Sequence, residues 1–426
     1  MGLLTPSENH TIRIKGPSPP LNFNVRNPGS KNVAMPILVA AALTGGNATI
    51  CRVPNLADIR ILLSILELLG VAVHRRGEEV DFSGGNIRSE EVPASLSSEL
   101  RGSIYTLALP AVRLGRGRIG AVGGDNLAGR SLEPHLRALR GFGLEATLSS
   151  DGLQVSGGFP RPSEFNLNER YAGVSATCLA LLIAASLEGR SVIRSVSGEP
   201  EVDDLLDCLK AFGVLVYRDG RAIAVQGPFN GDHLSYSVPI DTTYCGTMAM
   251  AAAITEGTAY ITNEAAARMG TIIPVLSSLG LTTVTHDGYL RLSGTVKFPQ
   301  RVETGEFPAF PSDLVPPLIA LLTKVPGESR VVEHVYKSRF DHVPYLVKMG
   351  VKCTLDGNEV KIVGGTVLHG GQVRGTGIRE TAALLLAALH AHGITEISNA
   401  GALARGYEDL PDDLAKAGAS VAMLSR

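Results

Sequence analysis

The hydrophobic positions of the chain repeat one pattern six times. Each copy has an apolar run with helical spacing, a Gly, a short run of alternating apolar and polar residues, a turn and a second short run. The glycines after the helical runs are 67 to 73 residues apart: Gly70, Gly143, Gly213, Gly280, Gly350 and Gly418. This period is too long for a thin solenoid repeat. It predicts one module of helices and strands that is used six times.

Each module also contains an Ala- and Leu-rich stretch, which its periodicity predicts to be a buried helix. Clear examples are 34–46, 177–189, 248–257 and 381–393. We expect the Gly at the end of each stretch to terminate the helix. The short alternating runs are joined by turn sequences such as RDG, HDG, SDG and DGN, which predict β-hairpins.

The first predicted strand, TIRIKG at 11–16, has no partner nearby, so we expect it to complete the last module. A chain of 426 residues is too long for one ordinary core. We therefore predict two α/β domains of three modules each. One contains 1–29 and 240–426, and the other contains 30–239 and carries a mobile loop at 122–132. The two crossings between them predict a hinge and a cleft.

The composition is that of a soluble globular protein, with 44% hydrophobic and 19% charged residues and a formal net charge of -2. This charge gives no overall reason to bind nucleic acid or an acidic membrane, and we expect neither partner. The five cysteines are scattered, which argues against disulfides and a zinc site. The apolar stretches are shorter than the roughly 18–20 residues that span a bilayer. The N-terminus has no signal pattern, so we expect a cytoplasmic protein.

Six positively charged side chains lie in loops and at predicted helix starts: Lys31, Arg101, Arg130, Arg339, Arg379 and Arg405. Arginine is well suited to bidentate contacts with carboxylate and phosphate. If several of them converge in one cleft, they predict an acidic substrate with more than one charged group. The alternative for each one is an ordinary solvated surface charge.

Two further segments leave alternatives open. The Gly-rich piece 122–130 is similar to a phosphate-binding loop, yet it fits neither common phosphate-loop motif, and a surface loop is the alternative. Asp313 precedes an apolar helical run. It is either the N-cap of that helix or a carboxylate base.

Five short motifs in this order carry a family resemblance: Gly29-Ser30-Lys31-Asn32, Gly123-Gly124 through Arg130, Phe310-Pro311-Ser312-Asp313, Arg339-Phe340 and Arg405-Gly406-Tyr407-Glu408. Together with the six repeats, they make nearly the whole chain similar to the enolpyruvyl transferase family. The resemblance is closest to the branch that acts on UDP-N-acetylglucosamine. It implies a two-domain inside-out α/β barrel, with three modules per domain, that closes on its substrates.

The resemblance also implies an activity. The enolpyruvyl group of phosphoenolpyruvate would pass to a hydroxyl of a uridine nucleotide, most simply the 3-hydroxyl of UDP-N-acetylglucosamine, with release of phosphate. Both substrates are small molecules, and neither a metal nor an organic cofactor is implied. The resemblance makes no prediction of oligomeric state.

The same resemblance assigns roles to residues. Phosphoenolpyruvate would be held by Lys31, Arg130, Arg379 and Arg405. The catalytic residues would be Asp125, Asp313, Lys31 and Arg405, with Asp125 or Lys31 delivering a proton. The acceptor would be bound by Asn32, Arg101, Arg130, Ser131, Leu132, Glu133, His135, Gly173, Ser175, Asp313, Val335 and Arg339. Glu199 and Asp241 match acidic positions near the hinge.

The chain departs from the family pattern mainly on the acceptor side. Asp125 stands where many members have Cys, so we expect insensitivity to fosfomycin, which alkylates that thiol. The family's DLR motif is Gly377-Ile378-Arg379 here, and its DRIE-like stretch reads Asp241-Thr242-Thr243-Tyr244. RSLEPH and GVSAT likewise replace RPVDLH and SVGAT.

These departures keep two alternatives open. One is an enzyme for another acceptor, such as UMP in nucleoside natural-product biosynthesis. The other is a non-catalytic or carbohydrate-binding relative. Shikimate 3-phosphate is a weaker candidate acceptor, because GSKN replaces the GSKS-type motif of that branch.

Overall fold

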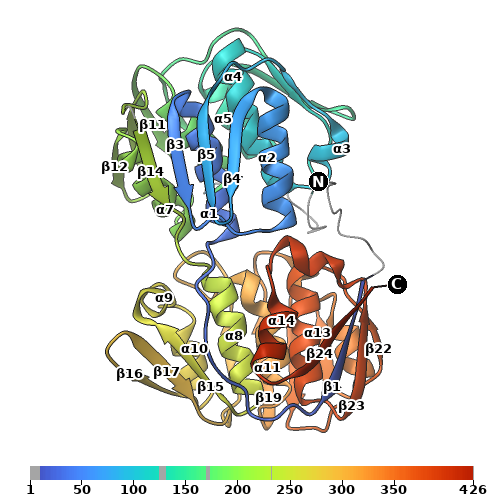
Figure 1. The fold of residues 1–426 in the computed structure, drawn as a ribbon. Coiled ribbons are helices and arrows are strands. Elements are labelled where there is room, and N and C mark those ends of the chain that lie inside the picture. Colours follow the sequence, from blue (N-terminus) through green and yellow to red (C-terminus); the bar gives the residue numbers. More distant parts are fainter. Residues whose placement is uncertain (1–9, 124–130, 169–172, 232, 426) are drawn as a thin grey trace. The chain divides into compact units, whose positions relative to one another are not determined.

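The computed structural model describes residues 10–123, 131–168, 173–231 and 233–425. These residues form two compact units, shown in Figure 1. The N-half unit contains the described residues between Gly29 and Pro239. The C-half unit contains the segment that ends at Pro28 and the segment that begins at Ile240. Each unit has its own core of buried apolar side chains.

The N-half unit contains three four-stranded sheets of the same topology. In each sheet a first strand pairs parallel with the second, and the other two strands continue antiparallel. In spatial order the sheets are β14 (His233–Ser237), β3 (Asn47–Cys51), β5 (Glu79–Gly85) and β4 (Val71–Arg76); β6 (Glu91–Val92), β7 (Gly117–Ile119), β9 (Gly152–Ser156) and β8 (Glu145–Ser149); and β10 (Glu164–Asn166), β11 (Gly189–Arg194), β13 (Ala222–Gly227) and β12 (Leu215–Asp219).

The C-half unit repeats this arrangement. Its sheets are β2 (Asn22–Asn24), β15 (Thr258–Thr262), β17 (Tyr289–Ser293) and β16 (Thr282–Thr285); β18 (Arg301–Glu303), β19 (Gly327–Val332), β21 (Glu359–Gly364) and β20 (Lys352–Asp356); and β22 (Gln372–Arg374), β23 (Gly393–Ser398), β1 (His10–Gly16) and β24 (Ser420–Ser425). The first strand of the chain, β1, lies between β23 and β24. TIRIKG therefore completes the last module, as predicted.

Largely buried helices that are rich in apolar residues form the centre of each unit. Helices that are covered on most faces need no wide polar face. They are α1 (Lys31–Thr44), α4 (Ala108–Leu114) and α6 (Val174–Ala185) in the N-half unit, and α8 (Thr242–Ile254), α11 (Val315–Leu322) and α13 (Ile378–His390) in the C-half unit. The three helices of each unit pack against one another. Figure 1 shows the C-half sheets outside α8, α11 and α13, so this unit has helices inside and strands outside.

A second, amphipathic helix of each module ends one or two residues before the repeated glycine. These helices are α2 (Ala57–Leu69), α5 (Glu133–Gly141), α7 (Pro200–Ala211), α10 (Ile273–Ser278), α12 (Val343–Lys348) and α14 (Leu410–Lys416). All six repeated glycines have φ between 78° and 109°, a region that favours glycine. Each donates its N–H to the carbonyl three residues earlier. This shared helix ending confirms the six-module reading.

The predicted glycine caps of the central helices are correct for α1 and α4, where Gly45 has φ 69° and Gly115 has φ 68°. Helices α6, α8 and α13 end before their glycines, at Ala185, Ile254 and His390. Ser186 and Thr255 follow two of these helices and donate their hydroxyls to carbonyls of the last turn. These bonds end the helix without glycine, and Gly189 instead begins β11 with φ 122°.

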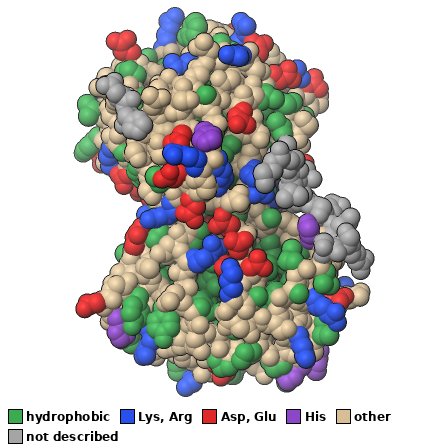
Figure 2. Space-filling view, in the orientation of Figure 1, with side chains coloured by type: hydrophobic (Ala, Val, Ile, Leu, Met, Phe, Trp, Pro, Cys, Tyr) green, Lys and Arg blue, Asp and Glu red, His purple; other side chains and the backbone are tan. Residues whose placement is uncertain are grey.

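None of the helices in the described ranges is long and apolar enough to cross a membrane. All five cysteines are in the described part of the chain and are free. On the face seen in Figure 2, acidic and basic side chains are intermingled. Within the described residues, no three His, Cys, Asp or Glu side chains are grouped so that they could hold a metal ion.

Candidate functional site

Asp313 is the centre of a charged cluster in the C-half unit. It lies in the short helix η2 (Ser312–Leu314), directly before α11. Arg339 donates to its Oδ1, and Arg379 donates to its Oδ2 from Nη2 at 3.0 Å and Nε at 3.3 Å. Its side chain does not cap α11, so the N-cap interpretation is wrong. The carboxylate is held on both oxygens by guanidinium groups, and 27% of its side chain is exposed.

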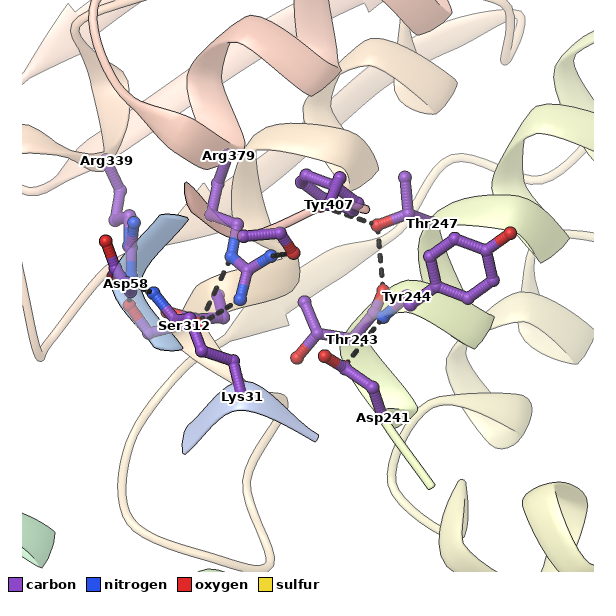
Figure 3. A network of polar contacts seen from close by, with 12 residues as sticks. Lys31, Asp58, Asp241, Thr243, Tyr244, Thr247, Ser312, Arg339, Arg379 and Tyr407 are labelled. Atoms are coloured by element: carbon purple, nitrogen blue, oxygen red, sulfur yellow. Dashed lines mark hydrogen bonds and ion pairs between the residues drawn. The ribbon is translucent and has the colours of Figure 1, made fainter. Parts of the chain in front are cut away.

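The two arginines of this cluster are buried, and Figure 3 shows their guanidinium ends. Arg339, in η3 (Lys337–Phe340), also lies 3.4 Å from Glu380 Oε1. Arg379, in the first turn of α13, donates to the Gly406 carbonyl and lies 4.9 Å from the centre of the Tyr407 ring. A buried charge needs such partners. The surface-charge alternative is therefore wrong for both arginines.

Electrostatics within the cluster keep Arg379 charged. Burial alone would lower its pKa, but the carboxylates, Asp313 first and then Asp241, outweigh burial and raise it. Burial raises the pKa of Asp241, against the opposing effect of Arg379. Asp241 caps α8 by accepting the Tyr244 N–H at 2.9 Å, as Figure 3 shows.

Two other predicted residues of the C-half unit are more exposed. Arg405 ends η4 (Ala400–Arg405) and is half-buried. It directly precedes Gly406 and Tyr407, which contact Arg379. Val335 is exposed, and its N–H donates to Glu333 Oε1 at 2.6 Å. Only its carbonyl and its side chain therefore remain to meet an acceptor.

Lys31 is the first residue of α1 in the N-half unit and is buried. Its Nζ lies 2.9 Å from Oδ2 of Asp58, a buried residue in the first turn of α2 (Figure 3). The ion pair fixes the ammonium group at the start of the helix. Lys31 is therefore not a solvated surface charge. Asn32 follows it and is half-buried.

A second group of predicted residues gathers near the N-terminus of α6. His135, on α5, has Nε2 2.9 Å from the Ser175 hydroxyl, and Gly173 is the N-cap of α6. Burial, assisted by the charge of Arg101, lowers the pKa of His135 to about 3, so the ring is neutral at pH 7. Arg101, at the start of η1 (Arg101–Leu107), makes a long 3.5 Å contact with the Ser131 carbonyl.

The remaining predicted residues are less informative. Leu132 is the N-cap of α5 and Glu133 its first residue, and the Glu133 carboxylate lies near Arg137 and Arg140. Glu199 is the N-cap residue of α7. Two predicted residues, Asp125 and Arg130, lie outside the described residues.

Sequence reasoning missed several partners of these residues. Asp58 resembles an ordinary acidic residue in the first turn of a helix. Glu380 and Glu333 gave a stronger signal, because each is an acid beside an otherwise apolar run, in RETAALLL and SRVVEH. A lone charge in such a run calls for a partner. The residue that pairs with such a charge is distant in the sequence, and no local pattern predicts which residue it is.

The chain belongs to the enolpyruvyl transferase family. It matches the family described as EPSP synthase (3-phosphoshikimate 1-carboxyvinyltransferase) over residues 15–414. A relative from Prosthecochloris aestuarii is 31% identical over 404 residues, which are 94% of this chain and 95% of the relative. One from Anaeromyxobacter dehalogenans is 34% identical over 411 residues, which are 94% of this chain and 96% of the relative. Both are named UDP-N-acetylglucosamine 1-carboxyvinyltransferase.

Solved structures share the fold. The enolpyruvyl transferase NikO from Streptomyces tendae has a TM-score of 0.88 at 23% identity, covering 98% of this chain and 99% of its own. EPSP synthase from Acinetobacter baumannii has a TM-score of 0.76 at 18% identity, covering 98% and 100%. These likenesses confirm the predicted inside-out α/β fold.

Proposed function

We propose that this protein transfers the enolpyruvyl group of phosphoenolpyruvate to a hydroxyl of a uridine nucleotide, most simply the 3-hydroxyl of UDP-N-acetylglucosamine. The observation that carries the proposal is the carboxylate of Asp313, held by two buried arginines and still partly exposed. Relatives named for this reaction, matched over more than nine-tenths of the chain, support the same activity.

In the proposed reaction Asp313 is the base. The guanidinium groups of Arg339 and Arg379 favour its ionised form, which is the form that accepts a proton. Their contacts also orient the carboxylate, and the exposed part of the side chain leaves room for a hydroxyl. Asp313 takes the acceptor's proton as the oxygen attacks.

The donor side needs cations and an acid. Phosphoenolpyruvate carries a phosphate and a carboxylate, which we assign to Lys31, Arg130, Arg379 and Arg405. Asp125 or Lys31 protonates C3 of the enol, so that positive charge develops at C2. The acceptor oxygen bonds to C2 and gives a tetrahedral ketal. Loss of a proton from C3 and of phosphate from C2 then restores the double bond, and fixed cations stabilise the phosphate throughout.

The acceptor's nucleotide is assigned to the group near the N-terminus of α6. A helix N-terminus presents free N–H groups that favour anions. Arg101 and Ser131 lie close to the neutral His135, which is bonded to Ser175. Asn32, Leu132, Glu133, Gly173, Val335 and Arg339 complete the proposed acceptor contacts.

A second candidate function is favoured by Tyr244, which stands where the family pattern has Glu. Its hydroxyl donates to Asp413 at 2.5 Å, and Arg26 also binds that carboxylate. Tyr244 ends the segment 241–244, which replaces the DRIE-like stretch of the family pattern. An enolpyruvyl transferase for another acceptor, such as UMP, fits this change.

The two units would be the two domains, with a hinge where the chain passes between them near Pro28 and Pro239. Both proposed substrates are small molecules of the cytoplasm, which is where we place the protein. No nucleic-acid partner is proposed.

An acceptor panel tests the proposal. The protein is mixed with phosphoenolpyruvate and with UDP-N-acetylglucosamine, UMP or shikimate 3-phosphate in turn, and phosphate release is followed. We expect the fastest release with UDP-N-acetylglucosamine. Faster release with UMP would favour the second candidate, and no release with any acceptor would favour a non-catalytic relative.

A further inference from the structure

Glu333 is a buried carboxylate that no part of the proposed chemistry uses. It follows β19 directly and is 1% exposed. Its backbone N–H donates to the Asn358 carbonyl at 2.8 Å, which ties it to the turn between β20 and β21. Among the described residues, no Lys, Arg or His lies within ion-pair distance of its carboxylate. A buried charge without a cation is unfavourable unless hydrogen bonds replace its hydration.

Four hydrogen bonds from neutral donors replace that hydration. Oε1 accepts from the Thr304 hydroxyl at 2.9 Å and from the backbone N–H groups of Val335 at 2.6 Å and Tyr336 at 2.9 Å. Oε2 accepts from the Ser312 hydroxyl at 2.9 Å. Hydrogen bonds to a charged acceptor are stronger than neutral ones. One side chain therefore joins three separate segments: the residue after β18, η2, and the loop at 335–336.

Two of these segments carry proposed site residues. Ser312 precedes Asp313, and its single proton is donated to Glu333. Its oxygen is therefore left to accept from Arg339 Nε, which is 3.4 Å away. Arg339 in turn donates to Asp313. A chain of contacts thus runs from Glu333 through Ser312 and Arg339 to the proposed base.

The third segment is the loop that begins with Val335. Glu333 takes the N–H groups of both Val335 and Tyr336, and the Val335 side chain is left exposed. The ring of Tyr336 lies 5.6 Å from the guanidinium carbon of Arg339, so the loop also packs on the same arginine.

We propose that Glu333 is a positioning residue for the acceptor side of the site. Resting on the proposed function, this inference assigns Glu333 to the joint orientation of the base Asp313 and the loop at 335–336. Glu333 touches neither substrate. Its loss changes acceptor use and leaves the binding of phosphoenolpyruvate intact.

The test compares three variants with the wild type. Glu333→Ala removes all four bonds, and Glu333→Asp keeps the charge but shortens the reach. Glu333→Gln keeps an oxygen for Thr304 and the two N–H groups. We expect the KM for the acceptor to rise about tenfold or more in the Ala and Asp variants, because each lost bond to a charged group is worth that much. The Gln variant should recover most of the affinity.

Two further measurements separate positioning from a structural role. The dissociation constant of phosphoenolpyruvate should be unchanged in every variant, and thermal unfolding identifies any that fail to fold. Glu359→Ala is the matched control, because Glu359 lies on β21 of the same sheet and pairs with Arg301 and Arg330. It should keep the wild-type KM for the acceptor.

The outcomes are distinct. An active wild type with unchanged acceptor KM in folded Glu333→Ala overturns the inference and leaves the proposed function standing. An equal loss of affinity for the acceptor and for phosphoenolpyruvate also overturns the inference. If Glu333→Ala does not fold, Ser312→Ala, which removes one bond, carries the test, and an unchanged acceptor KM there overturns the inference. A wild type without activity on any acceptor overturns the proposed function, and acceptor binding by calorimetry still tests the role of Glu333.

Discussion

Arg379 donates two hydrogen bonds to Oδ2 of Asp313, from Nη2 at 3.0 Å and from Nε at 3.3 Å. Arg339 occupies the other oxygen. Asp313 and Arg379 are 66 residues apart in sequence. Asp313 lies in η2 before α11, and Arg379 lies in the first turn of α13. Because the helices α11 and α13 pack against each other, the contact is a direct product of the fold.

Replacement of the base should abolish most turnover. We expect Asp313→Ala to lower kcat about 100-fold to 10,000-fold, the usual contribution of a general base, while acceptor still binds. Steady-state kinetics and calorimetric titration measure the two effects. Asp356→Ala, on the exposed end of β20, is the control. A near-native rate for Asp313→Ala would remove it as the base.

The cluster of Tyr244, Asp413 and Arg26 should contribute to stability. Tyr244 is buried and donates to the nearly buried Asp413. Tyr244→Phe leaves the ring and removes the hydroxyl, so we expect a loss of about 2 kcal/mol in the free energy of unfolding of the C-half unit. Urea denaturation measures it, with Tyr217→Phe on the exposed side of β12 as control. Equal midpoints for the two variants would contradict the expectation.

Three buried histidines should make the protein sensitive to acid. Burial lowers the pKa of His135 and His342 to about 3 and that of His390 to about 4, against 6.5 for the ordinary side chain. The unfolded chain therefore binds more protons than the folded one between about pH 3 and 6.5, and stability falls as the pH drops through this window. At about pH 5.5 each histidine should cost roughly 1 kcal/mol.

His342 offers the clearest test of this acid sensitivity. Within the described residues, neither of its ring nitrogens has a well-formed hydrogen bond, so the main effect of His342→Leu is to remove a proton site. Thermal unfolding at about pH 7.5 and about pH 5.5 should show a smaller difference in this variant than in the wild type. His369→Gln, at an exposed position, should leave the difference unchanged. If thermal unfolding of His342→Leu differed between the two pH values as much as that of the wild type, the assignment of the acid sensitivity to His342 would be refuted.

Fosfomycin should not inactivate the protein. Asp125 stands where many family members carry the thiol that the drug alkylates. Burial raises the pKa of the thiols of Cys178, Cys208 and Cys245, and that of Cys353 to about 12. Burial and Glu79 raise that of Cys51. Few thiolates are therefore available. Activity after incubation with the drug, compared with Asp125→Cys, checks this, and time-dependent loss in the wild type would disprove it.

The sequence predicts the fold well because its modules are local. Helix, glycine and hairpin follow one another within each repeat, and φ at the six repeated glycines follows from that order. Even the long-range place of β1 was predictable, since this strand has no partner nearby in the sequence. The ends of α6 and α8 were predicted wrongly because hydroxyl groups took the place of glycine, and α13 also ends before its glycine, at His390.

The site was predictable only in part. Lys31, Arg339 and Arg379 stood out as cations in unusual settings, and the family resemblance gave Asp313 its role as base. Their buried partners, Asp58 and Glu380, come from distant segments. Whether a charge is solvated or buried depends on which helices pack together. A single sequence does not predict which helices pack together.

The product of one reaction tests the central claim most directly. The wild-type protein is incubated with phosphoenolpyruvate and UDP-N-acetylglucosamine, and the nucleotide sugar is analysed by mass spectrometry and NMR. The account predicts an enolpyruvyl ether at the 3-hydroxyl, with one phosphate released for each ether formed. Recovery of unchanged nucleotide sugar, with no phosphate released, would contradict it.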